Sequence, residues 1–400
     1  MRYLLSIVAA IAVMLCLPAA AQTTYPGTLE ELKAEVVRRA ELKQYPVVVY
    51  DPEVVRGGAE LLQGTTEDDW ANAWIPIADG YNADAGQHEA RDERELAMED
   101  YLTAYRYYTL GRWPTPTSAR KRESYDRSLQ AFFAWDRLTE LPTEVLEHQV
   151  GDESIVGLLR MPENTSQPVP LFVALGGLDG YKENAAMGPS LSFARQGIAT
   201  LSLDAPGTVQ TVRASTTAWR HLMEVIDEVI ARPDIDASRV VLRGVSWGAY
   251  WSSQLAHRYA DRFIGVVSHG PAIHGAFAAE WVQHVVDVRE YFFDWRVALS
   301  YAFGTDDPSE LESLMPPMSL ETQGVLDNPT PPMLLVNGYR DEVWPIEDTF
   351  LLLERGTPKQ AWVNPQGIHM GRDSDVWDSG RIEAEVIGPW ILQRFELAAR

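Results

Sequence analysis

Apolar and polar positions in the first third of the chain alternate with a helical period. Between about residues 28 and 141 apolar side chains recur three or four positions apart, most clearly over 95–108 and 125–138. Thr117 and Ser118 precede the second of these segments and can cap it. The pattern predicts a helical N-terminal region.

After Pro142 the pattern changes to short β-rich runs that alternate with helical stretches such as 218–231 and 247–259. This alternation predicts an α/β fold, with a mostly parallel sheet and helices on both faces. Active sites in such sheets lie beyond the carboxyl ends of the strands. The expected strands are 145–150, 154–161, 171–175, 198–203, 240–242, 263–268, 333–336 and 361–363.

One interval, 275–328, departs from the alternation because it carries helical patterns rich in aromatic residues, followed by a loop containing proline. We expect it to form a lid over the site, or alternatively to pack its aromatic side chains against the sheet. A chain of 400 residues exceeds the usual size of a single core. The expected division is a signal peptide over 1–21, a helical cap domain over 22–142 and a catalytic domain over 143–400.

The first residues are typical of a secretory signal peptide. Arg2 precedes a nearly unbroken apolar run from Leu4 to Leu17, and a small-residue cleavage pattern ends at Ala21. The run is shorter than the roughly 20 residues that cross a bilayer. The bulky Leu15 before Cys16 argues against lipidation. We expect an exported protein, periplasmic or secreted, that is not inserted in the membrane after cleavage.

Composition narrows the possible functions. The net charge of -23 disfavours nucleic acid and anionic membranes as partners, and we expect a small-molecule substrate. Cys16 is the only cysteine, so the mature chain has no disulfide, thiolate metal site or thiol nucleophile. The chemistry proposed below requires no cofactor and no metal.

The strongest chemical signal is Gly244-Val245-Ser246-Trp247-Gly248, a G-x-S-x-G motif placed between a predicted strand and a predicted helix. In α/β-hydrolases this motif holds a nucleophilic serine on a sharp turn. Glycines two residues to either side let neighbouring backbone approach it closely. We therefore identify Ser246 as the candidate nucleophile.

A serine hydroxyl needs a base, and the base needs an acid that orients it. His369 follows the last predicted strand and is the preferred base, with His269 and His274 as alternatives near another strand end. Asp341 follows the strand 333–336 and is the preferred acid. Its neighbours Glu342, Glu347 and Asp348 are expected to be solvated.

The oxyanion that forms during acyl transfer needs preorganised donors. Gly176-Gly177-Leu178 follows the third predicted strand and can direct a backbone N–H of Gly177 or Leu178 toward it, opposite the N–H of Trp247. These three N–H groups are the candidate oxyanion hole.

With these motifs in place, the chain resembles the α/β-hydrolase family that includes dihydroxypseudooxynicotine hydrolase and the fermentation-respiration switch protein. The resemblance implies an α/β-hydrolase fold with a helical cap over the carboxyl edge of the sheet, a substrate pocket between the two, and a homodimer. It also implies hydrolysis of esters or of carbon-carbon bonds beside a carbonyl. The segments that carry it are 69–74, 105–114, 121–125, 176–183 and 203–207.

These observations favour a serine hydrolase that uses Ser246, His369 and Asp341. One alternative is a peptidase of the prolyl-oligopeptidase type, although that group carries a β-propeller where this chain is predicted to be helical. Another is a catalytically silent binding protein that kept the fold. Asp179, Lys182, Glu183 and Asp204, which lie in the signature segments, are interpreted as loop braces.

Overall fold

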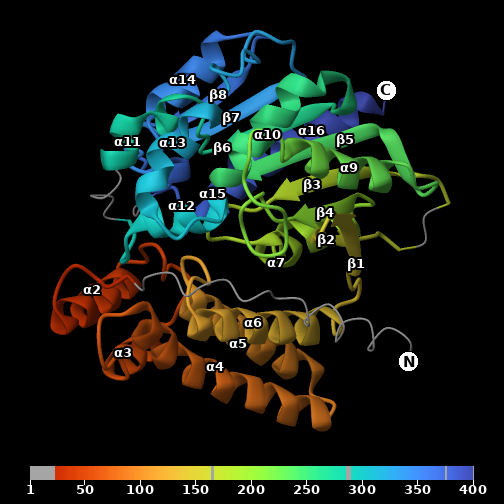
Figure 1. Cartoon of the computed structure of the whole chain (residues 1–400). Helices are drawn as coiled ribbons and strands as arrows, with labels where there is room; N and C mark the ends of the chain where they lie inside the picture. Colours follow the sequence, from red (N-terminus) through yellow and green to blue (C-terminus); the bar gives the residue numbers. More distant parts are fainter. Residues whose placement is uncertain (1–22, 164–165, 285–289, 374–375, 400) are drawn as a thin grey trace.

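The computed structural model describes residues 23–163, 166–284, 290–373 and 376–399 (Figure 1). The predicted signal peptide over 1–21 lies outside the described residues. The chain forms a helical region followed by a single sheet with helices on both faces, as the sequence predicts.

The N-terminal region is helical, and its helices lie together at one side of the molecule (Figure 1). Its first two long helices begin at capping boxes in which Thr28 and Thr66 accept backbone N–H groups. Ser118 caps the last helix by accepting from the Lys121 N–H at 3.2 Å, as predicted. The helices are α2 Leu29–Glu41, α3 Pro52–Glu60, α4 Glu67–Ala90, α5 Arg94–Arg112 and α6 Ala119–Asp136.

The sheet has eight strands in the order β1-β2-β4-β3-β5-β6-β7-β8, and all eight predicted strands are present. β2 pairs antiparallel with β1 and β4, and the other pairings are parallel. The strands are β1 Glu144–Val150, β2 Glu153–Arg160, β3 Val169–Leu175, β4 Ala199–Leu203, β5 Ile235–Val245, β6 Gly265–His269, β7 Met333–Gly338 and β8 Gln360–Asn364.

Several predicted strand boundaries are off by two or more residues, and the starts of β5 and β6 show why. β5 begins at Ile235, five residues before the apolar run, because Ile235 pairs with Val169 across an irregular register. The residues of β5 between Ile235 and Val240 give no hydrophobic signal, so only the pairing with β3 shows that the strand starts so early. β6 begins at Gly265 rather than at residue 263, because Gly265 is the first of its residues that pairs with β5, opposite Val241.

Alternate residues of the strands feed two separate apolar cores. Leu171, Val173 and Leu242 pack under α9 Trp219–Ile230 and α10 Trp247–Arg258. Phe172 and Val241 face the opposite way, toward α8 Pro189–Arg195 and the C-terminal α16 Gly388–Ala398. This period of two is what a strand buried on both faces requires. The remaining helices are α7 Lys182–Met187, α11 Ala279–His284, α12 Trp295–Phe303, α13 Leu311–Leu314, α14 Ile346–Glu354 and α15 Ser379–Ile382, and a π-helical turn, Glu383–Ile387, joins α15 to α16.

The aromatic interval between β6 and β7 joins the two parts of the molecule. Phe292 and Phe293 are buried in the core of the helical region, where each lies within 6 Å of the Trp70 ring centroid. Trp295 packs instead on Trp344, which follows β7. The described part of the interval therefore uses these aromatic residues for packing, and its movement as a lid stays a prediction.

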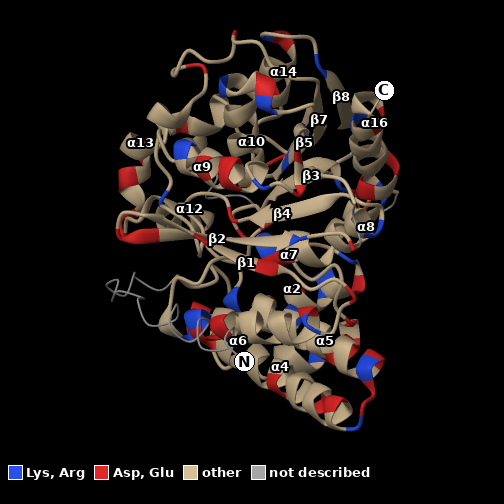
Figure 2. Cartoon of the chain, turned by 90° about the vertical axis from the view of Figure 1, so that its right-hand side faces the viewer, with Lys and Arg blue, Asp and Glu red and all other residues tan. Residues whose placement is uncertain are grey.

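Acidic and basic positions are interspersed along the helical region (Figure 2). No helix among the described ranges combines the length and the apolarity needed to cross a bilayer.

Candidate active site

Ser246 lies at the turn between β5 and α10, at the carboxyl end of the sheet. Its backbone has φ 53° and ψ -117°, a conformation that is strained for a residue with a side chain. The Ser246 N–H donates to the carbonyl of His269 at 2.7 Å, which ties the turn to the end of β6. Ser246 as a whole is neither fully buried nor fully exposed.

The two glycines of the motif are required by close backbone contacts. A Cβ at Gly244 would lie 2.0 Å from the carbonyl oxygen of Gly248. A Cβ at Gly248 would lie 2.2 Å from the carbonyl oxygen of Gly176, in the loop after β3. The motif therefore brings the turn of Ser246 and the loop of Gly176 and Gly177 together, because no side chain separates them.

His369 reaches Ser246 from the loop after β8. Its Nε2 lies 2.8 Å from Ser246 Oγ, and the imidazole is buried. This loop passes directly over the end of β7, where a Cβ at Gly338 would lie 2.0 Å from the carbonyl oxygen of Ile368. Gly338 therefore permits the approach that sets the position of His369.

Asp341 lies on the far side of the imidazole, with its Oδ2 2.8 Å from His369 Nδ1. Its Oδ1 accepts the backbone N–H groups of Val343 at 2.8 Å and Trp344 at 3.0 Å. Three contacts of this kind hold the carboxylate in one orientation. The hydroxyl, imidazole and carboxylate thus touch in sequence, although they come from three separate loops.

The alternative bases lie elsewhere. His269 is buried, its Nε2 contacts the Met370 carbonyl at 2.8 Å, and burial together with Arg243 lowers its pKa well below the usual value. His274 contacts Ser319 and Glu321. Neither is recorded in contact with Ser246, so the structure brings only His369 to it among the described histidines.

The expectation that Asp348 is solvated is wrong, whereas Glu342 and Glu347 are exposed as expected. Asp348 is 1% exposed and accepts backbone N–H groups from four successive residues, 273–276, at 2.6–3.2 Å. Burial raises its pKa, and these hydrogen bonds act in the opposite direction. Asp348 therefore anchors the chain after β6, because those four N–H groups need an acceptor where water is excluded.

The candidate oxyanion donors are not equivalent. The Gly177 N–H already donates to the Gly180 carbonyl at 2.7 Å. Among the described residues, neither the Leu178 N–H nor the Trp247 N–H has a recorded acceptor. A Cβ at Gly177 would lie 3.6 Å from Ser246 Cβ, so this loop does run beside the nucleophile. The geometry favours Leu178 and Trp247 over Gly177.

The signature segments brace the same loops. Lys182 Nζ lies 2.9 Å from Asp204 Oδ2 and 2.7 Å from Glu183 Oε1, and all three residues are buried. Burial opposes the charge of Lys182, but the two carboxylates outweigh it and raise its pKa. Asp179 has a further role that the sequence did not indicate, because its Oδ2 accepts from Tyr45 of the helical region and from Tyr291.

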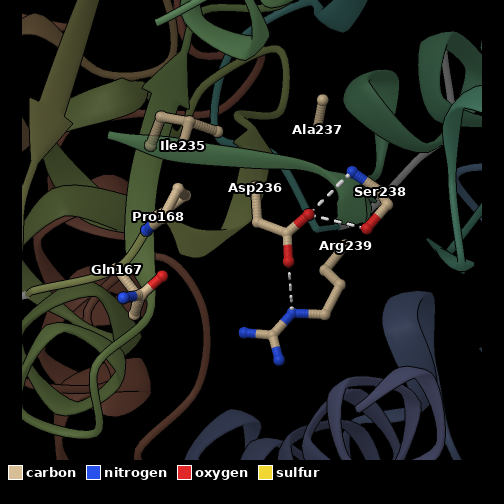
Figure 3. A pocket seen from close by; sticks show the side chains of 7 residues that line it. All are labelled: Gln167, Pro168, Ile235, Asp236, Ala237, Ser238 and Arg239. Carbon is tan, nitrogen blue, oxygen red and sulfur yellow. Dashed lines mark hydrogen bonds and ion pairs between the residues drawn. The ribbon is translucent and has the colours of Figure 1, made fainter. Parts of the chain in front are cut away.

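A surface hollow lies at the opposite edge of the sheet, at the amino ends of β3 and β5 (Figure 3). Asp236 in this hollow bonds Ser238 and pairs with Arg239 at 3.0 Å, so its polar groups already have partners. The hollow lies away from Ser246, which is at the carboxyl end of β5.

In the part of the chain that the structure describes, no group of three His, Cys, Asp or Glu residues is arranged to hold a metal ion.

Comparison with known proteins identifies the family. The family model described as esterase FrsA-like matches residues 60–363. The chain belongs to the FrsA-like esterase family. It is therefore an esterase-like hydrolase of the α/β-hydrolase superfamily, and the family resemblance inferred from its motifs is confirmed.

Two curated relatives and one solved structure support this placement. Esterase FrsA of Enterobacter sp. (strain 638) is 24% identical over 74% of this chain and 70% of its own length. Esterase FrsA of Escherichia coli (strain K12 / DH10B) is 26% identical over 66% of this chain, which spans 64% of that relative. The crystal structure of 2,6-dihydroxy-pseudo-oxynicotine hydrolase has a TM-score of 0.69, with 20% identity over 82% of this chain and 88% of its own, and shows the same fold.

Proposed function

We propose that this FrsA-like protein is a serine hydrolase that cleaves a carboxylic ester, or a carbon-carbon bond beside a carbonyl, in a small-molecule substrate. The observation that carries the proposal is the continuous contact from Ser246 Oγ through His369 to Asp341, with both steps at 2.8 Å. A hydrogen bond from His369 Nδ1 to Asp341 leaves Nε2 free to accept the proton of the serine hydroxyl.

In the proposed mechanism Ser246 Oγ attacks the substrate carbonyl carbon while His369 Nε2 takes the hydroxyl proton. Asp341 stabilises the imidazolium that results and does not itself take the proton. His369 then protonates the leaving alkoxide, or the leaving carbon in the carbon-carbon case. Water attacks the acyl-enzyme with His369 again as base, which releases the acid and restores Ser246.

The carbonyl oxygen becomes negatively charged in each tetrahedral intermediate. We assign its stabilisation to the N–H groups of Leu178 and Trp247, which lie on the loop after β3 and at the first turn of α10. The N-terminus of α10 adds a positive partial charge at the same point. Each such donor contributes about 3 to 4 kcal/mol in other hydrolases.

Substitution of the nucleophile tests the mechanism. Ser246→Ala is expected to lower the turnover of a p-nitrophenyl ester by roughly 10⁴-fold or more and to abolish labelling by a fluorophosphonate. Ser253→Ala is a matched control, because Ser253 is a buried serine of the same helix whose Oγ bonds Ser268 Oγ at 2.8 Å. Equal activity of the wild type and a folded Ser246→Ala variant would refute the assignment.

The same reagents separate the alternatives. A silent binding protein would not be labelled at Ser246. A serine peptidase would also be labelled and would also cleave activated esters, so efficient cleavage of acyl-peptide amides without carbon-carbon cleavage is the result that would favour it. We further propose export with cleavage after Ala21, together with a homodimer. The mass of the exported chain and its molecular mass by light scattering check these two points, and retention of residues 1–21 would count against export.

A further inference from the structure

Tyr45 lies in the chain between α2 and α3. Its position is set by the helical region itself. The Trp113 Nε1–H donates to Tyr45 Oη at 2.7 Å, and the Arg39 guanidinium donates to the Tyr45 carbonyl at 3.0 Å. Both the hydroxyl and the backbone of Tyr45 are therefore held by partners in the N-terminal part of the chain.

Through its hydroxyl Tyr45 contacts the loop that carries the proposed oxyanion donor. Tyr45 Oη donates to Asp179 Oδ2, the same oxygen that accepts from Tyr291 Oη at 2.7 Å. Asp179 directly follows Leu178, whose N–H is one of the two proposed donors. With Oδ2 held by two phenols, Asp179 keeps the backbone before it from rotating.

Through its ring Tyr45 contacts the loop that carries the proposed base. The Arg372 guanidinium carbon lies 4.9 Å from the centroid of the Tyr45 ring. Arg372 Nε donates to the carbonyl of His369 at 3.1 Å, and the guanidinium also pairs with Glu290. The ring therefore packs against a side chain of this same loop that donates to the backbone carbonyl of His369.

We propose that Tyr45 is a positioning residue of the active site: one side chain of the helical region that aligns the oxyanion loop through Asp179 and the base loop through Arg372. The inference rests on the proposed function, since it concerns the loops to which that function assigns the oxyanion donor and the base. It gives the helical region a part in the chemical step in addition to covering the sheet.

The proposal predicts a particular kinetic signature. Leu178 N–H and His369 act on charge that develops in the transition state, so misalignment lowers kcat more than it raises KM. Small displacements of such groups are costly, because a shift of about 1 Å can cost about 100-fold. A residue that only stabilises the fold would lower the melting temperature and leave the kcat of the folded protein unchanged.

The test compares two tyrosine hydroxyls of the helical region. Tyr45→Phe removes the contact with Asp179, and Tyr50→Phe removes a hydrogen bond of 2.7 Å to the Arg106 carbonyl inside the helical region. We expect Tyr45→Phe to lower kcat about 10-fold with KM changed less than about twofold. Tyr50→Phe should leave both constants near wild type. Equal kcat for Tyr45→Phe and Tyr50→Phe would overturn the proposal.

Double variants show which loop each part of Tyr45 serves. If the hydroxyl acts through Asp179, Tyr45→Phe adds little to the loss already caused by Asp179→Asn. If the ring acts through Arg372, the additional loss of kcat from Tyr45→Phe to Tyr45→Leu becomes small when Arg372 is replaced by Met. Full additivity in both pairs would refute the two routes. The rate of fluorophosphonate labelling per folded molecule gives a second measurement if a variant is only partly folded.

The same measurements keep the two proposals separate. If the wild type is not labelled at Ser246, the proposed function is wrong. If the wild type is labelled and active but folded Tyr45→Phe reacts at the wild-type rate, the proposed function stands and only the role of Tyr45 is rejected.

Discussion

Two buried carboxylates, one in each part of the molecule, differ in what their partners can do. Asp341 in the sheet region lies against His369, whose other ring nitrogen contacts Ser246 Oγ. Glu67 in the helical region lies 2.5 Å from Lys121 Nζ and accepts from Thr117, and both charged side chains are almost fully buried. Burial and pairing are similar, yet only the first pair can move a proton during a reaction.

The comparison teaches that a buried ion pair does not by itself indicate catalysis. Glu67 and Lys121 hold α4 against α6, and Lys121 also lies 5.1 Å from the Phe293 ring centroid of the interval between β6 and β7. Asp341 instead keeps one oxygen for an imidazole that contacts a hydroxyl. Substitutions in each pair should therefore affect different observables, activity in one case and folding in the other.

The largest effect is expected for Asp341→Asn. The amide would leave the imidazole in the wrong tautomer, so we expect kcat to fall roughly 10³- to 10⁴-fold, or about 4 to 5.5 kcal/mol, with little change in melting temperature. Asp348→Asn is the matched control, because Asp348 is equally buried but binds backbone N–H groups. It should destabilise the fold by about 1 to 3 kcal/mol. A kcat loss for Asp348→Asn as large as for Asp341→Asn would break the distinction.

Lys121→Met should have the next largest effect, on stability. It leaves the Glu67 carboxylate buried without its cation, which costs about 3 to 5 kcal/mol of unfolding free energy. Denaturant unfolding measures this loss, and the folded fraction should retain the wild-type kcat. The double variant Glu67→Gln with Lys121→Met should recover part of the stability.

An exposed pair provides the control for Lys121. Arg38 pairs with Glu35 at 2.7 Å, but the Arg38 side chain is 47% exposed. Arg38→Met should cost less than about 1 kcal/mol, because water already screens that pair. Comparable losses for Lys121→Met and Arg38→Met would show that burial of the ion pair does not set its contribution.

A further effect, confined to acid pH, is expected from His257 in α10, a buried histidine that is not recorded in contact with Ser246. Burial, together with Lys359, lowers its pKa to about 4. The unfolded chain takes up the proton near pH 6.5, so stability is full above that pH and falls as the pH drops toward 4, by about 3 kcal/mol. His257→Gln should flatten this part of the stability curve measured by thermal unfolding. An unchanged curve would show that His257 is not responsible.

Much of the fold could be predicted because its signals are local. Most strands contain a short apolar run between turn residues. Ser118 caps its helix by accepting the N–H of Lys121, only three positions further along the chain. The candidate site residues Ser246, Asp341 and His369 were proposed for a similar reason, since each lies in the loop after a predicted strand. A parallel sheet brings such strand ends to one edge.

The features that could not be predicted depend on distant segments. The sequence does not show that Asp348 is buried, because the four N–H groups it accepts belong to residues 273–276. The sequence offers the N–H groups of Gly177 and Leu178 as equivalent oxyanion donors. Only the structure shows that the Gly177 N–H is already bonded to the Gly180 carbonyl. Nothing near Tyr45 in the sequence indicates that it meets Asp179 and Arg372.

The amino-acid sequence alone determined the type of fold, the order of its strands along the chain and the residue types at each strand end, because periodicity, caps and turn glycines act over a few neighbouring positions. The tertiary structure decided which of those residues touch and which N–H groups stay free. It also decided that an N-terminal tyrosine reaches two loops of the site. The contacts of Tyr45 join segments more than a hundred residues apart, and no local pattern encodes them.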